Sequence, residues 1–261
     1  MSQGQVPESI SFPSYDGKQI YGYLYTPRPR KEPSPALIFV HGGPVAQDGY
    51  RWHGLFQPVI QRAVQRGFVC LDLNYRGGIG YGCEFEQASY GDMGTGLVKD
   101  IVHAADYLKE LDYVDGTRLG LMGHSYGGYL TVHTIELAPS VFKAAVEVAG
   151  VMDWRAYLKF GVTYFAMKMG YPEDEVERYK EWSPVDNVDA IQTPLLIVHG
   201  TNDPNVRIHE HAYPLITRLI EHKKEFDMRI YPEEGHVYWN PNVRYDLFKQ
   251  VERFFDRYLK D

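Results

Sequence analysis

The sequence predicts an α/β protein with a mainly parallel central sheet and helices on both faces of that sheet. One observation is a set of short apolar runs, such as 36–40 and 195–198, which turn residues bound on either side. These runs have the length of buried strands. A second observation is that apolar residues recur at helical spacing between the runs, as in 97–111. Strands that alternate with helices pair in parallel and are covered on both faces.

Each element can be placed along the chain in order. The expected strands are apolar or alternating runs that span 8–13, 18–26, 36–40, 68–73, 118–122, 144–149, 195–198 and 226–231. The expected helices span 52–66, 97–111, a stretch from Ser125, 207–223 and 243–258. Residues 151–185 interrupt this rhythm, so we expect one domain over 1–261 with a lid or cap insertion at 151–185.

Composition excludes several classes of function. The chain of 261 residues has a net charge of −7, which argues against nucleic acid as a partner. No apolar run is long enough to span a membrane, and the first residues lack a secretory signal. Two cysteines make neither a disulfide framework nor a metal-ligand set, so a reduced, cytoplasmic protein is expected. No metal or organic cofactor is implied, and association into a homo-oligomer is left open.

Residues 123–128, Gly-His-Ser-Tyr-Gly-Gly, carry the strongest chemical motif. They follow an expected strand and open an expected helix, which is the context of the Gly-x-Ser-x-Gly nucleophile elbow of the α/β-hydrolase fold. The sharp turn lifts the Ser125 hydroxyl clear of the sheet, and the glycines leave room for close backbone approach. The motif predicts that Ser125 is a nucleophile.

A serine nucleophile needs a base and an acid that orients the base. On this fold the chain order is Ser, then Asp or Glu, then His. Asp203 follows the strand 195–198, and His236 follows the strand 226–231, so both lie on loops at the same sheet edge. We therefore expect Asp203 as the acid and His236 as the base, with Asp153 as the best alternative acid.

The other histidines near these motifs are weaker candidates for the base. The side chain of His124 is expected to point away from the Ser125 hydroxyl, and His199 is expected to pack at a strand end. His209 and His211 fall on the expected helix 207–223, where they look solvated.

An oxyanion hole needs two backbone donors. One donor is expected to be the N–H of Tyr126, the residue after the nucleophile. The second is expected from the loop 41–44, His-Gly-Gly-Pro, which follows the strand 36–40. Pro44 has no N–H, so Gly43 is preferred and Gly42 is second.

Together these segments resemble the catalytic domain of the prolyl oligopeptidase family of serine peptidases, most of all its acylaminoacyl-peptidase and dipeptidyl-peptidase-like branch. The resembling segments, which come in family order, are 41–44, 74–82, 91–94 with Asp100, 123–128, 183–184, 199–203 with Val206, and 234–236. The resemblance implies the same triad and oxyanion donors, and it adds Val206 to the substrate site. The family usually carries an N-terminal β-propeller. This sequence starts close to the hydrolase segment, so we expect a stand-alone relative or an excised catalytic domain.

Residues 151–185 are rich in aromatic side chains. As part of an insertion at the functional sheet edge, they are expected to line an acyl-side pocket together with Val206. The expected lining residues are Trp154, Tyr157, Phe160, Tyr164 and Phe165. The alternative is a pair of amphipathic helices whose aromatics belong to the core.

The leading function is thus a serine hydrolase that cleaves acyl bonds through an acyl-enzyme, most of all a peptidase acting on small peptides or acylated amino acids. A carboxylesterase that acts on ester substrates would use the same machinery. A non-catalytic binding protein on a hydrolase fold is a remote third reading.

Overall fold

The computed structural model describes residues 4–28, 33–49, 55–159 and 163–260. In this part of the chain, eight strands form one sheet in the order β1-β2-β4-β3-β5-β6-β7-β8. The strands are β1 Glu8–Pro13, β2 Gln19–Tyr25, β3 Ser34–Val40, β4 Val69–Asn74, β5 Val114–His124, β6 Ala144–Val148, β7 Leu195–Gly200 and β8 Phe226–Tyr231. β1, β2 and β4 pair antiparallel, whereas all pairs from β4 to β8 are parallel. The predicted α/β-hydrolase fold is confirmed.

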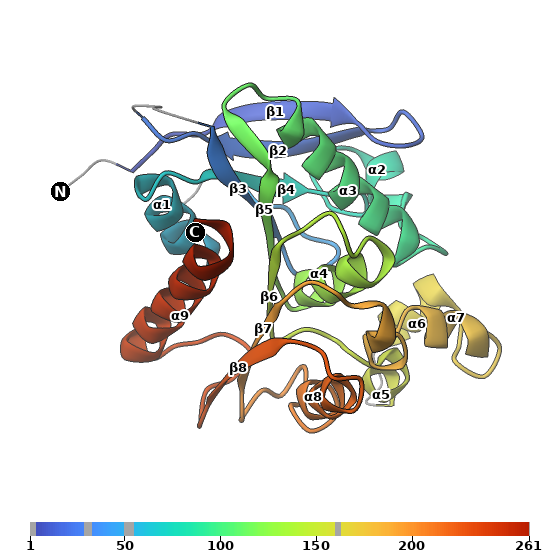
Figure 1. The fold of residues 1–261 in the computed structure, drawn as a ribbon. Coiled ribbons are helices and arrows are strands. Elements are labelled where there is room, and N and C mark those ends of the chain that lie inside the picture. The colour runs from blue at the N-terminus through green and yellow to red at the C-terminus, as the bar shows by residue number, and fades with distance from the viewer. Residues whose placement is uncertain (1–3, 29–32, 50–54, 160–162, 261) are drawn as a thin grey trace.

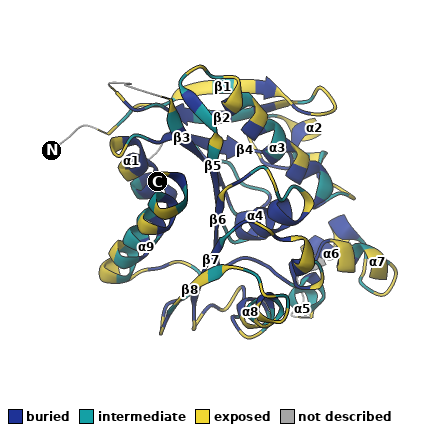
Figure 2. Ribbon diagram, in the orientation of Figure 1, coloured by how far each residue is buried: buried dark blue, intermediate teal, exposed yellow. Residues whose placement is uncertain are grey.

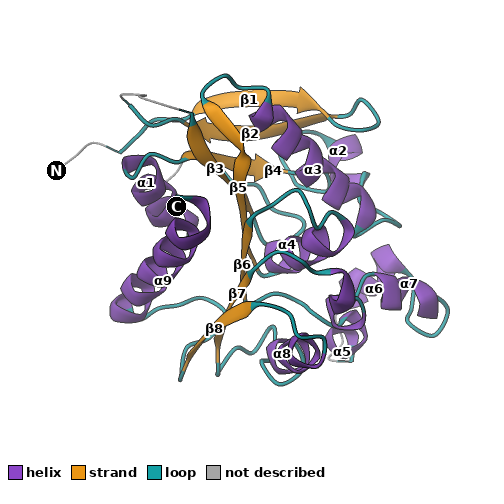
Figure 3. Ribbon diagram, viewed as in Figure 1, coloured by secondary structure: helices purple, strands orange, loops and turns teal. Residues whose placement is uncertain are grey.

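Helices cover both faces of this sheet (Figures 1 and 3). α1 and α9 lie on one face, and α3, α4 and α8 lie on the other. The helices are α1 Phe56–Gln65, α2 Cys83–Gln87, α3 Thr95–Lys109, α4 Tyr126–Leu137, α5 Trp154–Leu158, α6 Thr163–Met169, α7 Val176–Glu181, α8 Ala212–Glu221 and α9 Pro241–Leu259, with short 3-10 turns at Pro184–Asp186 and Val188–Ala190. The central strands are almost entirely buried (Figure 2), as their continuous apolar runs predict.

Two helices begin several residues later than expected. α1 begins at Phe56, and residues 52–54 of the expected helix lie outside the described residues. α8 begins at Ala212 instead of residue 207. Just before it, the Asp203 carboxylate accepts hydrogen bonds from the backbone N–H groups of Asn205 and Val206, both at 2.8 Å. After these bonds, residues 208–211 form a separate turn in which the backbone N–H groups of Glu210 and His211 both donate to the Arg207 carbonyl, and the helix starts after this turn.

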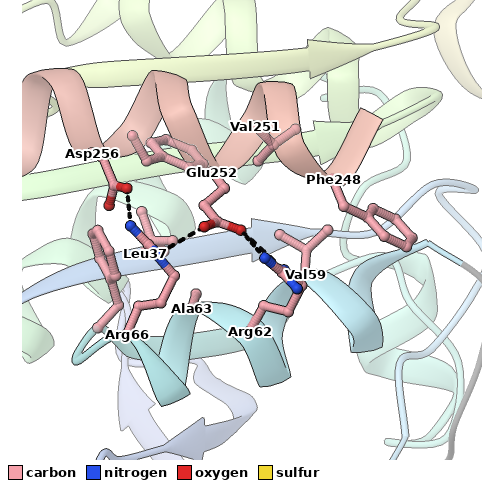
Figure 4. Close-up of a pocket in the computed structure, with 11 residues that line it drawn as sticks. Leu37, Val59, Arg62, Ala63, Arg66, Phe248, Val251, Glu252 and Asp256 are labelled. Carbon is pink, nitrogen blue, oxygen red and sulfur yellow. Dashed lines mark hydrogen bonds and ion pairs between the residues drawn. The ribbon is translucent and has the colours of Figure 1, made fainter. Parts of the chain in front are cut away.

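α1 and α9 are joined by ion pairs above an apolar floor (Figure 4). Arg66 pairs with Glu252 at 2.7 Å and also with Asp256, and Arg62 donates from Nε to Glu252 at 3.0 Å. Beneath these charges, Leu37 and Val251 are buried between the helices and the sheet. The ion pairs link α9 to α1, and the apolar side chains beneath them pack α9 against the sheet.

A buried arginine fixes the loop that follows β4. Arg76 binds the Asp100 carboxylate through Nε at 2.8 Å and Nη2 at 2.7 Å, and it also pairs with Asp16 at 2.8 Å. Next to it, the Tyr75 hydroxyl donates to the His41 carbonyl at 2.8 Å, and the two rings stack. The loop after β4 therefore supports the loop after β3.

Across the described residues, no helix combines the length and apolar character needed to cross a membrane.

Candidate active site

Ser125 sits on the sharp turn between β5 and α4. Its φ of 59° and ψ of −120° are unusual for a residue with a side chain. The turn is possible because glycine stands on both sides of it. A Cβ on Gly123 would lie 2.0 Å from the Gly127 carbonyl oxygen, and a Cβ on Gly127 would lie 1.9 Å from the Val40 carbonyl oxygen. The Ser125 hydroxyl thus stands at the N-terminus of α4, above the carboxyl end of the sheet.

The structure brings Ser125, His236 and Asp203 into one hydrogen-bonded line. The Ser125 hydroxyl lies 2.8 Å from His236 Nε2, and His236 Nδ1 lies 2.7 Å from Asp203 Oδ2. The three residues come from the loops after β5, β8 and β7. This geometry matches a nucleophile, a base and an orienting acid.

The environment of Asp203 favours its charged form. Burial alone would raise the pKa of this carboxyl. Hydrogen bonds from His236 and from the backbone N–H groups of Val206 and Asn205 nevertheless bring the pKa below its ordinary value. Asp203 is therefore a carboxylate that can hold His236 with the proton on Nδ1.

Asp153, the alternative acid, is engaged elsewhere. It caps α5 by accepting from the backbone N–H groups of Arg155 and Ala156, and it pairs with the Arg155 guanidinium at 3.0 Å. The carboxylate that accepts the hydrogen bond of His236 Nδ1 belongs to Asp203 instead.

The neighbouring histidines support the loops. His124 Nε2 donates to the His236 carbonyl at 2.9 Å, so it holds the loop after β8. Burial, together with the nearby His236, lowers the pKa of His124 to about 4, so the ring is neutral. His199 is buried at the end of β7, and its Nε2 donates to the Val206 carbonyl at 2.7 Å.

The expectation that His211 is solvated was wrong. Its side chain is 1% exposed and lies at the N-cap of α8, while His209 remains exposed. His211 Nδ1 accepts from the backbone N–H groups of Met152 and Asp153, both at 3.3 Å. Burial, together with His199, lowers its pKa to about 3. A neutral ring thus fastens the start of the segment 151–185.

The loop after β3 lies beside Ser125. A Cβ added to Gly42 would be 3.1 Å from Ser125 Cβ and 3.7 Å from Ser125 Oγ. Gly43 has a φ of 137°, which favours glycine. Tyr126 is the first residue of α4, where backbone N–H groups lack helical partners. Both expected oxyanion segments therefore flank Ser125.

The aromatic residues of 151–185 cluster on Tyr126. Trp154 packs edge-on against the Tyr126 ring at 5.9 Å, and Phe165 stacks on the same ring at 6.3 Å. Trp154, Phe165 and Val206 are buried, so in the expected pocket they would support the lining side chains more than they would contact substrate. Tyr157 is half-buried and Tyr164 is 45% exposed. Phe160 lies outside the described residues.

A buried carboxyl that has no sequence motif lies below the elbow. Glu147 Oε2 accepts from the Gly150 backbone N–H at 2.9 Å, and a Cβ on Gly150 would touch both this oxygen and Gly128. Burial raises the pKa of Glu147 to about 8. Its only sequence signal is a charged residue inside an apolar strand.

In the described residues, no group of three or more His, Cys, Asp or Glu side chains could hold a metal ion.

Comparisons with known proteins point to one family. The prolyl oligopeptidase family model matches residues 55–261. Dipeptidyl aminopeptidase BIII of Pseudoxanthomonas mexicana is 29% identical over 251 residues, which are 89% of this chain and 35% of the relative. The acylamino-acid-releasing enzyme of Arabidopsis thaliana is 28% identical over 238 residues, which are 87% of this chain and 30% of the relative.

A solved structure, an acylaminoacyl peptidase in complex with Z-Gly-Gly-Phe-chloromethyl ketone, superimposes with a TM-score of 0.90 at 26% identity. The match covers 99% of this chain and 42% of that one. The chain thus spans about a third of the length of the two curated relatives. Its sequence, fold and site geometry lead to one conclusion: the chain belongs to the prolyl oligopeptidase family.

Proposed function

We propose that this chain is a serine peptidase that works through an acyl-enzyme, with Ser125 as nucleophile, His236 as base and Asp203 as orienting acid. The observation that carries the proposal is the continuous hydrogen-bonded line, 2.8 Å from Ser125 Oγ to His236 Nε2 and 2.7 Å from His236 Nδ1 to Asp203. Family membership supports the same reading.

The chemistry follows from this line. Ser125 Oγ attacks the substrate carbonyl carbon while His236 Nε2 takes the hydroxyl proton. The protonated His236 then gives that proton to the leaving nitrogen, and the carbon–nitrogen bond breaks to leave an ester on Ser125. Water, deprotonated by His236, attacks the ester and frees the acid and the serine. The negative oxygen of each tetrahedral intermediate would be held by the N–H groups of Tyr126 and Gly43.

Asp203 works through His236. Its carboxylate stabilises the imidazolium and keeps the proton on Nδ1, so that Nε2 is free to accept the serine proton. The lowered pKa of Asp203 keeps this carboxylate charged at neutral pH.

Small peptides and acylated amino acids are the proposed substrates. The support comes from the relatives, whose names describe dipeptidyl and acylamino-acid-releasing enzymes, and from the peptide chloromethyl ketone bound to the solved neighbour.

We also propose that 151–185 forms a lid whose aromatics, with Val206, shape a pocket for bulky apolar acyl groups. The packing of Trp154 and Phe165 on Tyr126, next to the nucleophile, supports this role.

Ester hydrolysis by the same machinery is part of the proposal, because an ester leaving group departs more easily than an amine.

A cytoplasmic location is also proposed. Its support is that both cysteines are free thiols, Cys70 buried and Cys83 exposed.

The test is to replace Ser125 by Ala and to measure turnover of a phenylalanyl p-nitroanilide and a p-nitrophenyl ester. We expect kcat to fall by about 10⁴-fold or more on both substrates, because the nucleophile is lost. Ser140→Ala, at an exposed serine, is the matched control and should keep full turnover. A fluorophosphonate probe should label the wild type at Ser125. Normal turnover by the folded Ser125→Ala variant would reject the assignment.

A further inference from the structure

A second pocket lies beside His236, away from the aromatic residues that pack on Tyr126. The residues next to Ser125 in the chain, His124 and Tyr126, mark these two sides of the site. The Tyr126 ring packs on Trp154, whereas the His124 ring packs on the His236 ring with centroids 4.8 Å apart. The pocket is on the His124 side and is lined by Leu55, His124, His236, Val237, Tyr238 and Arg244.

The described residues that line it include one permanent cation. His124 is neutral, because burial brings its pKa to about 4, and burial keeps the Tyr238 hydroxyl protonated by raising its pKa well above 10. Among these described residues, Arg244 alone brings a fixed charge. Among the described residues, its guanidinium has no hydrogen bond and no ion pair. A guanidinium that has no partner among the described residues and lines a pocket is suited to an anionic ligand.

The position of Arg244 is fixed by α9. The residue lies in the first turn of this helix, which Asn240 caps by accepting from the Asn242 backbone N–H at 3.0 Å. Farther along α9, Glu252 and Asp256 bind the arginines of α1 (Figure 4). The guanidinium is therefore presented from a rigid element and not from a loop.

Peptide cleavage places a particular group at this pocket. His236 Nε2 must protonate the leaving nitrogen, so the leaving residue lies against His236. In a C-terminal residue, the α-carbon bonded to that nitrogen also carries the free carboxylate. The carboxylate is thus close to His236 and within the region that Arg244 lines.

We propose, building on the proposed peptidase function, that this pocket is the leaving-group subsite and that Arg244 binds the free α-carboxylate of a single C-terminal amino acid. Leu55 and Val237, which is 48% exposed, would contact the apolar side chain of that residue. The chain would then favour N-acylated dipeptides, from which it releases the last amino acid.

The experiment compares substrates that share one acyl group. Benzyloxycarbonyl-phenylalanyl-alanine with a free carboxylate is compared with its C-terminal amide, and the p-nitroanilide of the same acyl group serves as the wild-type check of peptidase activity. For the wild type we expect kcat/KM on the acid to exceed that on the amide by about 10- to 100-fold, the range for a charge-assisted hydrogen bond.

Arg244→Ala and Arg244→Gln should bring that ratio close to one. Arg244→Lys should keep part of the preference, because it retains the charge without the forked donor geometry. Arg253→Ala is the matched control, since Arg253 is an exposed arginine of α9 that lines a different depression. It should keep the wild-type ratio.

The outcomes separate the two proposals. Wild-type turnover without a preference for the acid, or a preference that survives in folded Arg244→Gln, overturns the subsite and leaves the peptidase function standing. If the wild type cleaves none of the substrates, the proposed function fails. The subsite is then judged by titrating the acid and the amide into Ser125→Ala, with and without Arg244→Gln. Equal binding of acid and amide there overturns it.

Discussion

Replacing Asp203 by Asn tests whether this carboxylate controls the proton of His236. The surroundings of Asp203 determine how the new amide would sit. Oδ1 accepts from the backbone N–H groups of Asn205 and Val206, both at 2.8 Å. In the Asp203→Asn variant the amide oxygen must take this position, because an NH₂ group there would face two donors.

The amide NH₂ then faces His236 Nδ1, which the carboxylate now holds at 2.7 Å. A donor at this position requires Nδ1 to be the acceptor, so the neutral imidazole carries its proton on Nε2. That proton points at Ser125 Oγ, 2.8 Å away, and the base can no longer accept the serine proton. A wrong tautomer of this kind lowers kcat by about 10⁴-fold in a well-studied serine protease triad.

We therefore expect Asp203→Asn to lower kcat on the p-nitroanilide by roughly 10³- to 10⁴-fold while KM and the melting temperature change little. Asp153→Asn is the matched control. Asn caps helices about as well as Asp, so the cap on α5 should survive and activity should stay near that of the wild type. Nearly full activity of Asp203→Asn, combined with an inactive Asp153→Asn, would refute the reasoning and make Asp153 the acid.

Three further predictions concern the base, the lid and the buried carboxyl. His236→Ala should lower kcat about as much as Ser125→Ala, because the residues act as a unit; steady-state rates near those of the wild type would contradict this. Trp154→Ala, at a side chain that is 0% exposed, should lower the free energy of unfolding by about 3–5 kcal/mol in urea titrations. Tyr164→Ala, at a side chain that is 45% exposed, should cost less than about 1 kcal/mol but should raise KM for phenylalanyl over acetyl esters; equal effects on both esters would argue against a pocket role. The pKa of Glu147 is raised from 4.5 to about 8, so between these pH values the native state holds a proton that the unfolded chain has released. The free energy of unfolding should therefore fall with rising pH by up to about 1.4 kcal/mol per unit, and urea titrations at several pH values should show a smaller slope for Glu147→Gln.

The sheet and the relative places of the candidate triad could be predicted because each depends on local signals. Continuous apolar runs specify buried parallel strands, and the carboxyl ends of such strands meet at one edge. Ser125, Asp203 and His236 each follow such a run, so their positions after parallel strands predict that they lie at the same edge of the sheet. The helix expected at 207–223 starts only at Ala212, because residues 208–211 form a turn closed by bonds to the Arg207 carbonyl, and such a turn has no distinct periodic signal.

The surroundings of the site depend on contacts between distant segments, which sequence spacing does not record. His211 looks solvated beside Glu210, but it is buried because the backbone of Met152 and Asp153 meets it from another loop. Arg244 lies in an amphipathic helix like any other surface arginine. It belongs to no recognisable motif, and only the fold shows that it lines the same pocket as His236.

The aromatic residues of 151–185 show why a pocket and a core look alike in sequence. Both need large apolar side chains at similar spacing. Trp154 is buried because Tyr126 and Tyr129, on the helix that follows the nucleophile, pack against its ring at 5.9 and 5.1 Å. Tyr164, on the same aromatic segment, has no such cover and stays exposed. Trp154 therefore couples the packing of the proposed lid to the residue that bears the proposed oxyanion donor, so its loss should disturb both stability and catalysis. The exposed Tyr164 is the side chain of this segment that we expect to contact substrate directly.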